Sequence, residues 1–178
     1  MASDSTLLGA AGEHYVMAEL LRRGYIAALA PQGVPNVDVV VTDRDGSRLC
    51  SIQVKTRWNG SNGGWMMNAK HERITGERLF YCFVDMKQEN EKPLVFIVPA
   101  TVVSNALSVS HQKWLATPGR SGQTHKNTPV RQFLPNYSHI FLQEKHEFGE
   151  GWLDRYREKW DILGLEQAPV DIEDGSDE

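Results

Sequence analysis

The chain has 178 residues, of which 40% are hydrophobic, and this length suits one domain with a buried core. It contains no run of about 18 apolar residues and no N-terminal signal segment, so the sequence argues against a membrane span or secretion and favours a cytoplasmic protein. The formal net charge of -4 argues at first against a nucleic-acid partner.

The charge is distributed unevenly along the chain. Residues 170–178 hold five acids and no base, so residues 1–169 carry a net charge of +1. We expect a single domain over residues 1–165 and an acidic, disordered tail at 166–178. Residues 92–143 contain five Lys and Arg but no Asp or Glu, which suits a phosphate-facing surface; the alternative is a solvated loop region that lacks acids by chance.

The two cysteines, Cys50 and Cys82, lie in apolar runs that are expected to form strands. They lack CxxC spacing and neighbouring histidines, which argues against a zinc site. We therefore predict two buried free thiols.

Residues 6–23 are predicted to form a helix, because apolar residues recur there every three or four positions and Gly24 follows as a stop signal. Glu13 lies on the apolar stripe near the helix start, where Gly9 and Gly12 permit close approach of another backbone. Two explanations fit an acid at this position. One is the helix dipole, worth about 0.3–1 kcal/mol, and the other is a site in which the carboxylate meets a metal or a cation.

A β-hairpin is expected next. Residues 25–29 form a short strand, residues 37–42 and 48–56 form two longer strands, and Asp43–Gly46 makes the turn between the longer two.

The faces of this hairpin follow from its expected register. A symmetric four-residue turn places Asp38 opposite Ser51, with Gln53 as its diagonal neighbour. Side chains alternate along a strand, so Gln53 and Lys55 share one face, and Asp38 joins them there. The hairpin should therefore bring a carboxylate, an amide and an ammonium group together.

Residues 57–67 are rich in Gly and Asn and are expected to form a flexible loop, which carries Trp58 and Trp65 and has Arg57 and Lys70 nearby. The two indole rings allow two interpretations. They stack on nucleobases, or they cover the edge of the core, as the large buried surface of most Trp residues favours.

The remaining elements are predicted from apolar runs and turn signals. They are strands at 79–84 and 94–98, a short helix at 99–107, a loop-rich segment at 110–135, a strand at 136–143 and an amphipathic helix at 150–163.

The ordered set of helix acid Glu13, strand acid Asp38 and strand end Gln53-Val54-Lys55-Thr56 resembles the PD-(D/E)XK phosphodiesterase superfamily, which contains restriction enzymes, archaeal Holliday-junction resolvases and some homing endonucleases. The resemblance covers residues 9–56 and continues loosely to Pro99. It implies an α/β (α+β) fold with a restriction endonuclease-like core, in which a mixed β-sheet is flanked by helices.

The resemblance also implies a metal-dependent endonuclease acting on DNA, with Glu13, Asp38, Gln53 and Lys55 as catalytic residues. The first three would bind Mg²⁺ or Mn²⁺, which prefer oxygen ligands, and Lys55 would assist the attacking water. The family more often has Glu or Asp at the position of Gln53, so weaker metal affinity is expected. A catalytically weak or inactive module that binds nucleic acid or a protein partner is the alternative, and a soluble protein with no nucleic-acid role is a third.

DNA is the expected partner, and a homodimer is expected as well, since cutting both strands of a duplex with one small domain usually requires two copies. The residues assigned to nucleic-acid contact are Arg57, Trp58, Trp65, Lys70, Lys113, Arg120, Lys126 and Arg131.

Overall fold

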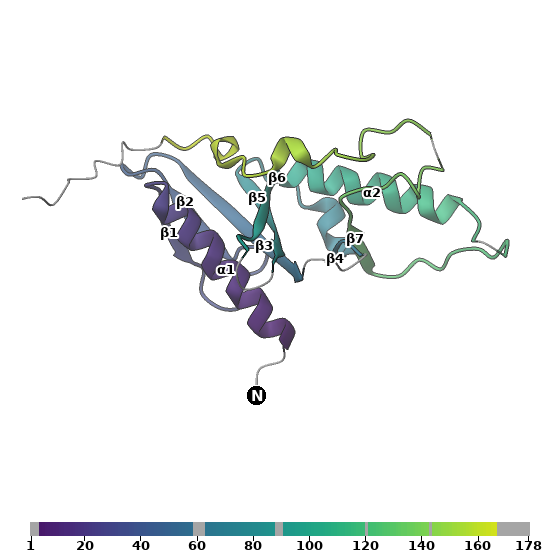
Figure 1. Cartoon of the computed structure of the whole chain (residues 1–178), viewed down its shortest axis with the longest axis horizontal. Coiled ribbons are helices and arrows are strands. Elements are labelled where there is room, and N and C mark those ends of the chain that lie inside the picture. The colour runs from purple at the N-terminus through teal and green to yellow at the C-terminus, as the bar shows by residue number, and fades with distance from the viewer. Residues whose placement is uncertain (1–3, 59–62, 88–90, 120, 143, 167–178) are drawn as a thin grey trace, which may run out of the picture.

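The structure, a computed structural model, describes residues 4–58, 63–87, 91–119, 121–142 and 144–166. Two parts are visible in Figure 1: a large twisted sheet with helix α1 (Asp4–Arg22) beside it, and a second part around helix α2 (Ala100–Ala116). In the part of the chain that is described, no helix is long and apolar enough to cross a bilayer. Of the expected acidic tail, residues 167–178 lie outside the described residues.

The large sheet has five strands in the order β1-β2-β3-β5-β6. Their bounds are Ile26–Leu29 for β1, Val39–Thr42 for β2, Leu49–Trp58 for β3, Leu79–Met86 for β5 and Leu94–Pro99 for β6. Strands β3 and β5 run parallel, and the other neighbours run antiparallel. The prediction of a mixed sheet flanked by helices is thereby confirmed.

Helix α1 covers one face of this sheet. Its Val16 and Leu20 are fully buried in one cluster with Ile52 of β3 and with both cysteines. Cys50 and Cys82 are buried and free, as predicted. The hydrophobic side chains of β3 that point toward α1 therefore form a core with it.

The approach of α1 to β3 is closest at Gly12. A Cβ atom added there would overlap the Thr56 hydroxyl on β3, whereas one added at Gly9 would meet open space. The close approach expected from the two glycines is therefore made by Gly12. Because Glu13 follows directly, this contact fixes how far the Glu13 carboxylate lies from β3.

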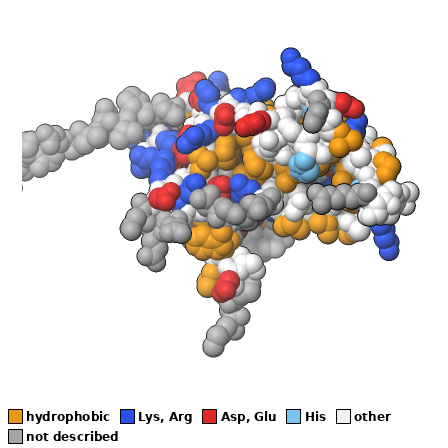
Figure 2. Space-filling view, turned by 45° about the vertical axis from the view of Figure 1, so that its right-hand side comes forward, with side chains coloured by type: hydrophobic (Ala, Val, Ile, Leu, Met, Phe, Trp, Pro, Cys, Tyr) orange, Lys and Arg blue, Asp and Glu red, His pale blue; other side chains and the backbone are white. Residues whose placement is uncertain are grey.

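The other face of the sheet is covered by α2 and by a two-stranded sheet of β4 (Trp65–Asn68) and β7 (Val130–Phe133). A short 3₁₀ helix, η1 (Ala69–Arg73), follows β4. Aromatic rings fill this layer, and those of Phe83 and Phe133 stack with centroids 4.0 Å apart. In Figure 2 the charged side chains of the visible face gather mostly on the left, whereas the part that contains α2, on the right, shows mainly hydrophobic and uncharged groups.

Three predictions for residues 99–142 are wrong. Helix α2 continues to Ala116 instead of ending near Leu107, and the segment expected to be a loop also contains β7. The strand expected at 136–143 is replaced, over its described residues, by hydrogen-bonded turns such as the one closed by Ile140 N and Tyr137 O at 2.8 Å. Burial of Tyr137 against the aromatic layer holds this segment without a strand partner.

The amphipathic helix predicted at residues 150–163 is also wrong, because the segment forms two 3₁₀ turns, Asp154–Tyr156 and Trp160–Leu163. Glu158 lies between them with a φ of 52°, which a continuous helix does not allow. Its backbone N–H donates to Val95 O at 2.9 Å instead. Hydrogen bonding to the edge strand β6 therefore replaces the intrahelical bonds that the sequence pattern predicted.

The hairpin register differs by two residues from the predicted one. Val40 lies opposite Ser51, where Asp38 was expected. The turn is shifted by one residue along the chain, since the Asp43 N–H donates to Arg48 O at 3.4 Å and leaves residues 44–47 between them. A shift of two residues keeps every side chain on its face, so Asp38 still shares the face of the glutamine and lysine of β3.

Substitution of the two helix glycines tests the α1–β3 contact. Gly12→Ala should lower the free energy of unfolding by about 1–3 kcal/mol, because the added methyl overpacks a filled contact. Gly9→Ala, in the same helix, should raise it by up to about 1 kcal/mol, since alanine is the better helix former. Urea denaturation followed by circular dichroism measures both, and equal effects would show that α1 does not meet β3 at Gly12.

Candidate active site

The site is built around the start of β2, where Asp38 is held against β3 by two hydrogen bonds. Its backbone N–H donates to Ile52 O at 2.9 Å, and its carboxylate Oδ2 accepts from Val54 N–H at 2.7 Å. These bonds place Asp38 opposite Gln53, one pair beyond the last pair of the β2–β3 ladder. One carboxylate oxygen is thus used to fix the residue, and the other is left for a ligand.

Gln53 is the most informative residue of the site. Its side chain is only 6% exposed, yet its amide oxygen Oε1 accepts no hydrogen bond from any described residue. A buried amide oxygen without a partner costs about 1–3 kcal/mol, so native proteins rarely leave one unpaired. A cation next to Gln53 would supply the missing partner.

Lys55 and Glu13 complete the constellation. Burial lowers the pKa of Lys55, and Lys70 lowers it further, whereas the negative charges of Asp38 and Glu13 oppose this shift. Burial also raises the pKa of Glu13, and the nearby Asp38 carboxylate adds to the rise. Each of the three charged groups therefore lies within electrostatic reach of the other two. The structure thus places Glu13, Asp38 and Lys55 within electrostatic reach of one another, and Gln53 lies opposite Asp38 on the neighbouring strand.

The donor set suits a hard cation. Two carboxylates and one amide supply only oxygen atoms, the ligands that Mg²⁺ and Mn²⁺ prefer. Among the described residues, no three His, Cys, Asp or Glu side chains cluster as metal ligands, because the third oxygen here comes from an amide. The residues present therefore fit a divalent ion that keeps several of its own waters.

The eight residues assigned to nucleic-acid contact are placed very differently. Trp65 is 1% exposed and lies in the core, so stacking on nucleobases is wrong for this residue and the alternative, core packing, holds. Its ring nitrogen donates to Val84 O at 2.9 Å. Trp58, by contrast, is 58% exposed, and Lys70 and Lys126 are exposed as well.

Three of the assigned basic residues pair with acids of the chain. Arg57 binds Asp85 at 2.9 Å and lies 3.9 Å from the ring centroid of Trp65. Arg131 is buried and pairs with Glu72, and Lys113 pairs with Glu144 at 2.8 Å. Arg57 and Arg131 therefore act first as internal structural cations, and Arg120 lies outside the described residues.

Sequence reasoning missed a buried polar pair beside the site. The Nδ1 atom of His71, on η1, is 2.8 Å from the hydroxyl of Tyr81, and Tyr81 lies directly next to Gln53 in the β3–β5 ladder. Burial lowers the pKa of His71 to about 4, and the charges of Lys55 and Lys70 add to this shift. No sequence motif surrounds His71, which follows the predicted loop. Only its contact with Tyr81 of β5 shows that it lies beside the site.

Comparisons with known proteins define the fold. No protein-family model and no curated protein sequence matches the chain. Its structure is similar to that of a bacterial homing endonuclease, I-Ssp6803I, with a TM-score of 0.51 and 18% identity over 92% of each chain. It is also similar to Hjc, a Holliday junction resolvase from the archaeal hyperthermophile Archaeoglobus fulgidus, with a TM-score of 0.44 and 13% identity over 90% of this chain and 98% of that one.

The mixed sheet and this likeness place the chain in the restriction endonuclease-like fold class, as predicted. At 18% identity, the likeness to the homing endonuclease establishes the fold alone.

The buried histidine makes stability depend on pH. The unfolded chain protonates His71 near pH 6.5, but the folded protein does so only near pH 4, so stability should fall as pH drops from about 6.5 to 4. The loss should reach about 1–3 kcal/mol. Urea midpoints at several pH values, in EDTA, should show a shallower decline for His71→Asn than for the natural chain, and equal slopes would contradict the assignment.

Proposed function

We propose that the protein is a divalent-metal-dependent phosphodiesterase that cleaves DNA. The single observation that carries this proposal is the buried Oε1 of Gln53, which has no partner among the described residues and lies opposite Asp38, with Glu13 and the partly buried Lys55 in electrostatic reach of that carboxylate. A purely structural strand would gain nothing from burying this amide without a partner beside three partly buried charged groups, because each group loses hydration. The similarity to a homing endonuclease supports DNA as the substrate.

Glu13, Asp38 and Gln53 would hold Mg²⁺ or Mn²⁺. A bound ion would polarise the phosphoryl oxygen and lower the pKa of the attacking water. The hydrogen bond from Val54 N–H orients the Asp38 carboxylate, and the Gly12 contact sets the distance of Glu13 from it. The protein thereby preorganises the oxygen ligands on two strands and one helix.

Lys55 can serve the reaction in two ways. Its lowered pKa increases the fraction of neutral amine, which can accept a proton from the attacking water. In its charged form, the ammonium group would stabilise the negative charge that develops on the phosphoryl oxygens. Both roles require the ammonium nitrogen to lie next to the scissile phosphate, which its position two residues after Gln53 on one strand face provides.

A second candidate function is a nuclease-fold module that binds nucleic acid or a protein partner without cutting DNA. The observation that favours it is the amide at Gln53, which supplies one negative charge fewer than a carboxylate and weakens metal binding. The main proposal includes a homodimer, because a nuclease of this size would need two copies to cut both strands of a duplex.

Single substitutions test the catalytic assignment. Purified protein with Mg²⁺ or Mn²⁺ should cut DNA, and Asp38→Asn and Lys55→Ala should each lower the rate about 10²–10⁴-fold. Lys145→Ala, at an exposed lysine outside the site, is the control and should cut at the natural rate. Gel assays of plasmid and linear DNA measure the rates. Full activity in both site variants would overturn the assignment.

Replacement of the amide by a carboxylate tests the metal site independently of cleavage. Gln53→Glu should bind Mn²⁺ at least about tenfold more tightly, because a negative charge then faces the ion at close range. Gln112→Glu, on the exposed surface of α2, should leave the affinity unchanged. Isothermal titration calorimetry gives both dissociation constants, and an unchanged constant for Gln53→Glu would show that this side chain does not face the ion.

A further inference from the structure

A polar cleft of about 590 Å³ opens beside the candidate active site. Its walls come from η1, which carries Lys70 and Arg73, and from the segment Asn127–Pro129 that leads into β7. Lys70 is close enough to Lys55 for each charge to act on the other. The side of the cleft that carries Lys70 therefore lies nearest to the candidate site.

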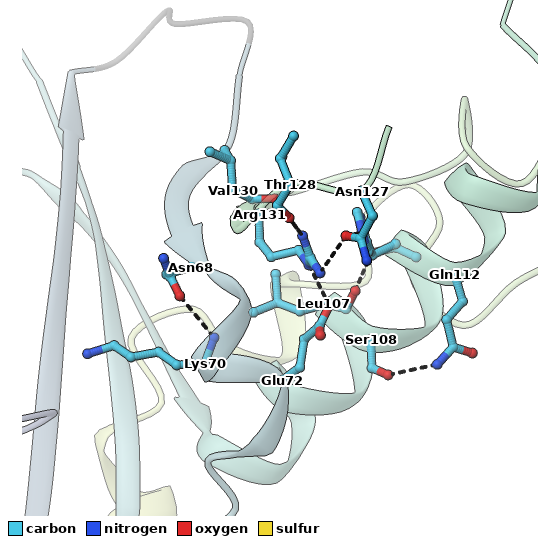
Figure 3. A network of polar contacts seen from close by, with 12 residues as sticks. Asn68, Lys70, Glu72, Leu107, Ser108, Gln112, Asn127, Thr128, Val130 and Arg131 are labelled. Carbon is cyan, nitrogen blue, oxygen red and sulfur yellow. Dashed lines mark hydrogen bonds and ion pairs between the residues drawn. The ribbon is translucent and has the colours of Figure 1, made fainter. Parts of the chain in front are cut away.

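The charge inside this cleft is positive. Its single carboxylate, Glu72, is bound by the buried Arg131, whose guanidinium also donates to the carbonyl oxygens of Thr128 and Val130. Figure 3 shows this network and shows Lys70 reaching away from it. Among the described residues, Lys70 and Arg73 make no ion pair.

Lys70 and Arg73, which have no acidic partner among the described residues, thus line a cleft whose carboxylate, Glu72, is already paired with Arg131. Such a cleft favours an anion, and its position next to the proposed scissile phosphate favours further phosphates of the same chain.

A second hollow of about 280 Å³ adjoins the cleft, and the two share Thr128 and Arg131 in their walls. The lining of this second hollow is apolar, unlike that of the cleft, and includes Leu107, Leu134 and Ile140. Trp114 and two histidines, His111 and His139, complete the wall.

The rings of this hollow, which we call the aromatic pocket, hold one another in place. Trp114 stacks on His125, which lies outside the lining of the pocket, with ring centroids 3.9 Å apart, and on His111 with centroids 5.5 Å apart. His111 Nε2 is 3.0 Å from Asn127 Oδ1, which ties α2 to the wall of the cleft. The pocket is therefore preformed, apolar and edged by polar ring nitrogens, the properties of a site for a flat heterocycle.

We propose that the cleft and the aromatic pocket together bind one unpaired nucleic-acid strand where it leaves the active site, with phosphates on Lys70 and Arg73 and a base in the aromatic pocket. This inference rests on the proposed function and adds the form of the substrate to it. A base in a duplex is paired and stacked, so it cannot enter a walled pocket without being extruded. An unpaired base pays no such cost, and proteins that bind single strands combine a cationic groove with aromatic contacts in this way.

Binding in Ca²⁺, followed by fluorescence anisotropy, tests the proposal. A labelled single strand of about 12 nucleotides should bind more tightly than a hairpin duplex of the same length. The double variant Lys70→Glu/Arg73→Glu should bind the single strand at least about tenfold more weakly and with a shallower salt dependence. The control for charge reversal is Arg44→Glu, in the exposed β2–β3 turn at the other end of β3, which should bind as the natural chain does.

The aromatic pocket is tested separately with 2-aminopurine placed at successive positions of the single strand. One position should show quenched fluorescence in the natural chain and recover it in Trp114→Leu, with melting curves confirming that the variant is folded. Equal affinity for single strand and duplex, a double variant no weaker than Arg44→Glu, or quenching that Trp114→Leu leaves intact would each overturn the inference.

These results separate the inference from the proposed function. If duplex DNA is cut in Mg²⁺ but substitution of Lys70, Arg73 and Trp114 leaves the affinity for single strands unchanged, the inference fails and the proposed function stands. If those residues govern single-strand binding while no DNA is cut and no metal is bound, the function fails and the strand site stands.

Discussion

The alternation of side chains along β3 is the constraint on which the rest of the structure depends. The strand pairs with β2 on one side and with β5 on the other, and both of its faces carry packed groups. Ile52 and Val54 point into the core under α1, and Gln53 and Lys55 point to the opposite face. A slip of one residue would bury an ammonium and an amide in the hydrophobic core, at a cost of several kcal/mol. The hydrogen bond from Val54 N–H to the Asp38 carboxylate holds the strand against this slip.

The same alternation explains the electrostatics of the candidate site. Two carboxylates and one buried ammonium converge there, and burial shifts the pKa of Glu13 upward and that of Lys55 downward. A third carboxylate at position 53 would add a further buried negative charge to the metal-free protein. The neutral amide avoids this repulsion and leaves an oxygen atom available.

In the second part of the molecule, acids from outside the acid-free stretch pair with cations inside it. Residues 92–143 contain no Asp or Glu, yet Glu72 binds Arg131 and Glu144 binds Lys113. Two of the cations expected on the surface are therefore paired within the protein. The unpaired positive charge beside the site comes instead from η1, at Lys70 and Arg73, before the acid-free stretch begins. Composition alone therefore did not show which cations of the stretch are paired within the protein.

Local patterns were sufficient for the N-terminal half. Helix α1, the hairpin and the shared face of Asp38, Gln53 and Lys55 followed from periods of 3.6 and 2 residues. The register of the hairpin was wrong by two residues, but an even shift leaves each side chain on the predicted face of the sheet. These features depend on neighbours in the chain, and the sequence by itself determined them.

Only the tertiary structure decided the rest, because it depends on contacts between distant segments. Trp65 lies in a Gly-rich segment, yet pairing of β4 with β7, about 65 residues later, carries it into the aromatic core. Residues 150–163 have a helical pattern but bind the edge of β6, since an unpaired strand edge offers backbone partners that no local pattern encodes. The contact of His71 with Tyr81 and the adjacency of cleft and pocket arise in the same way, from the folding of η1, α2 and β7 onto one face of the sheet.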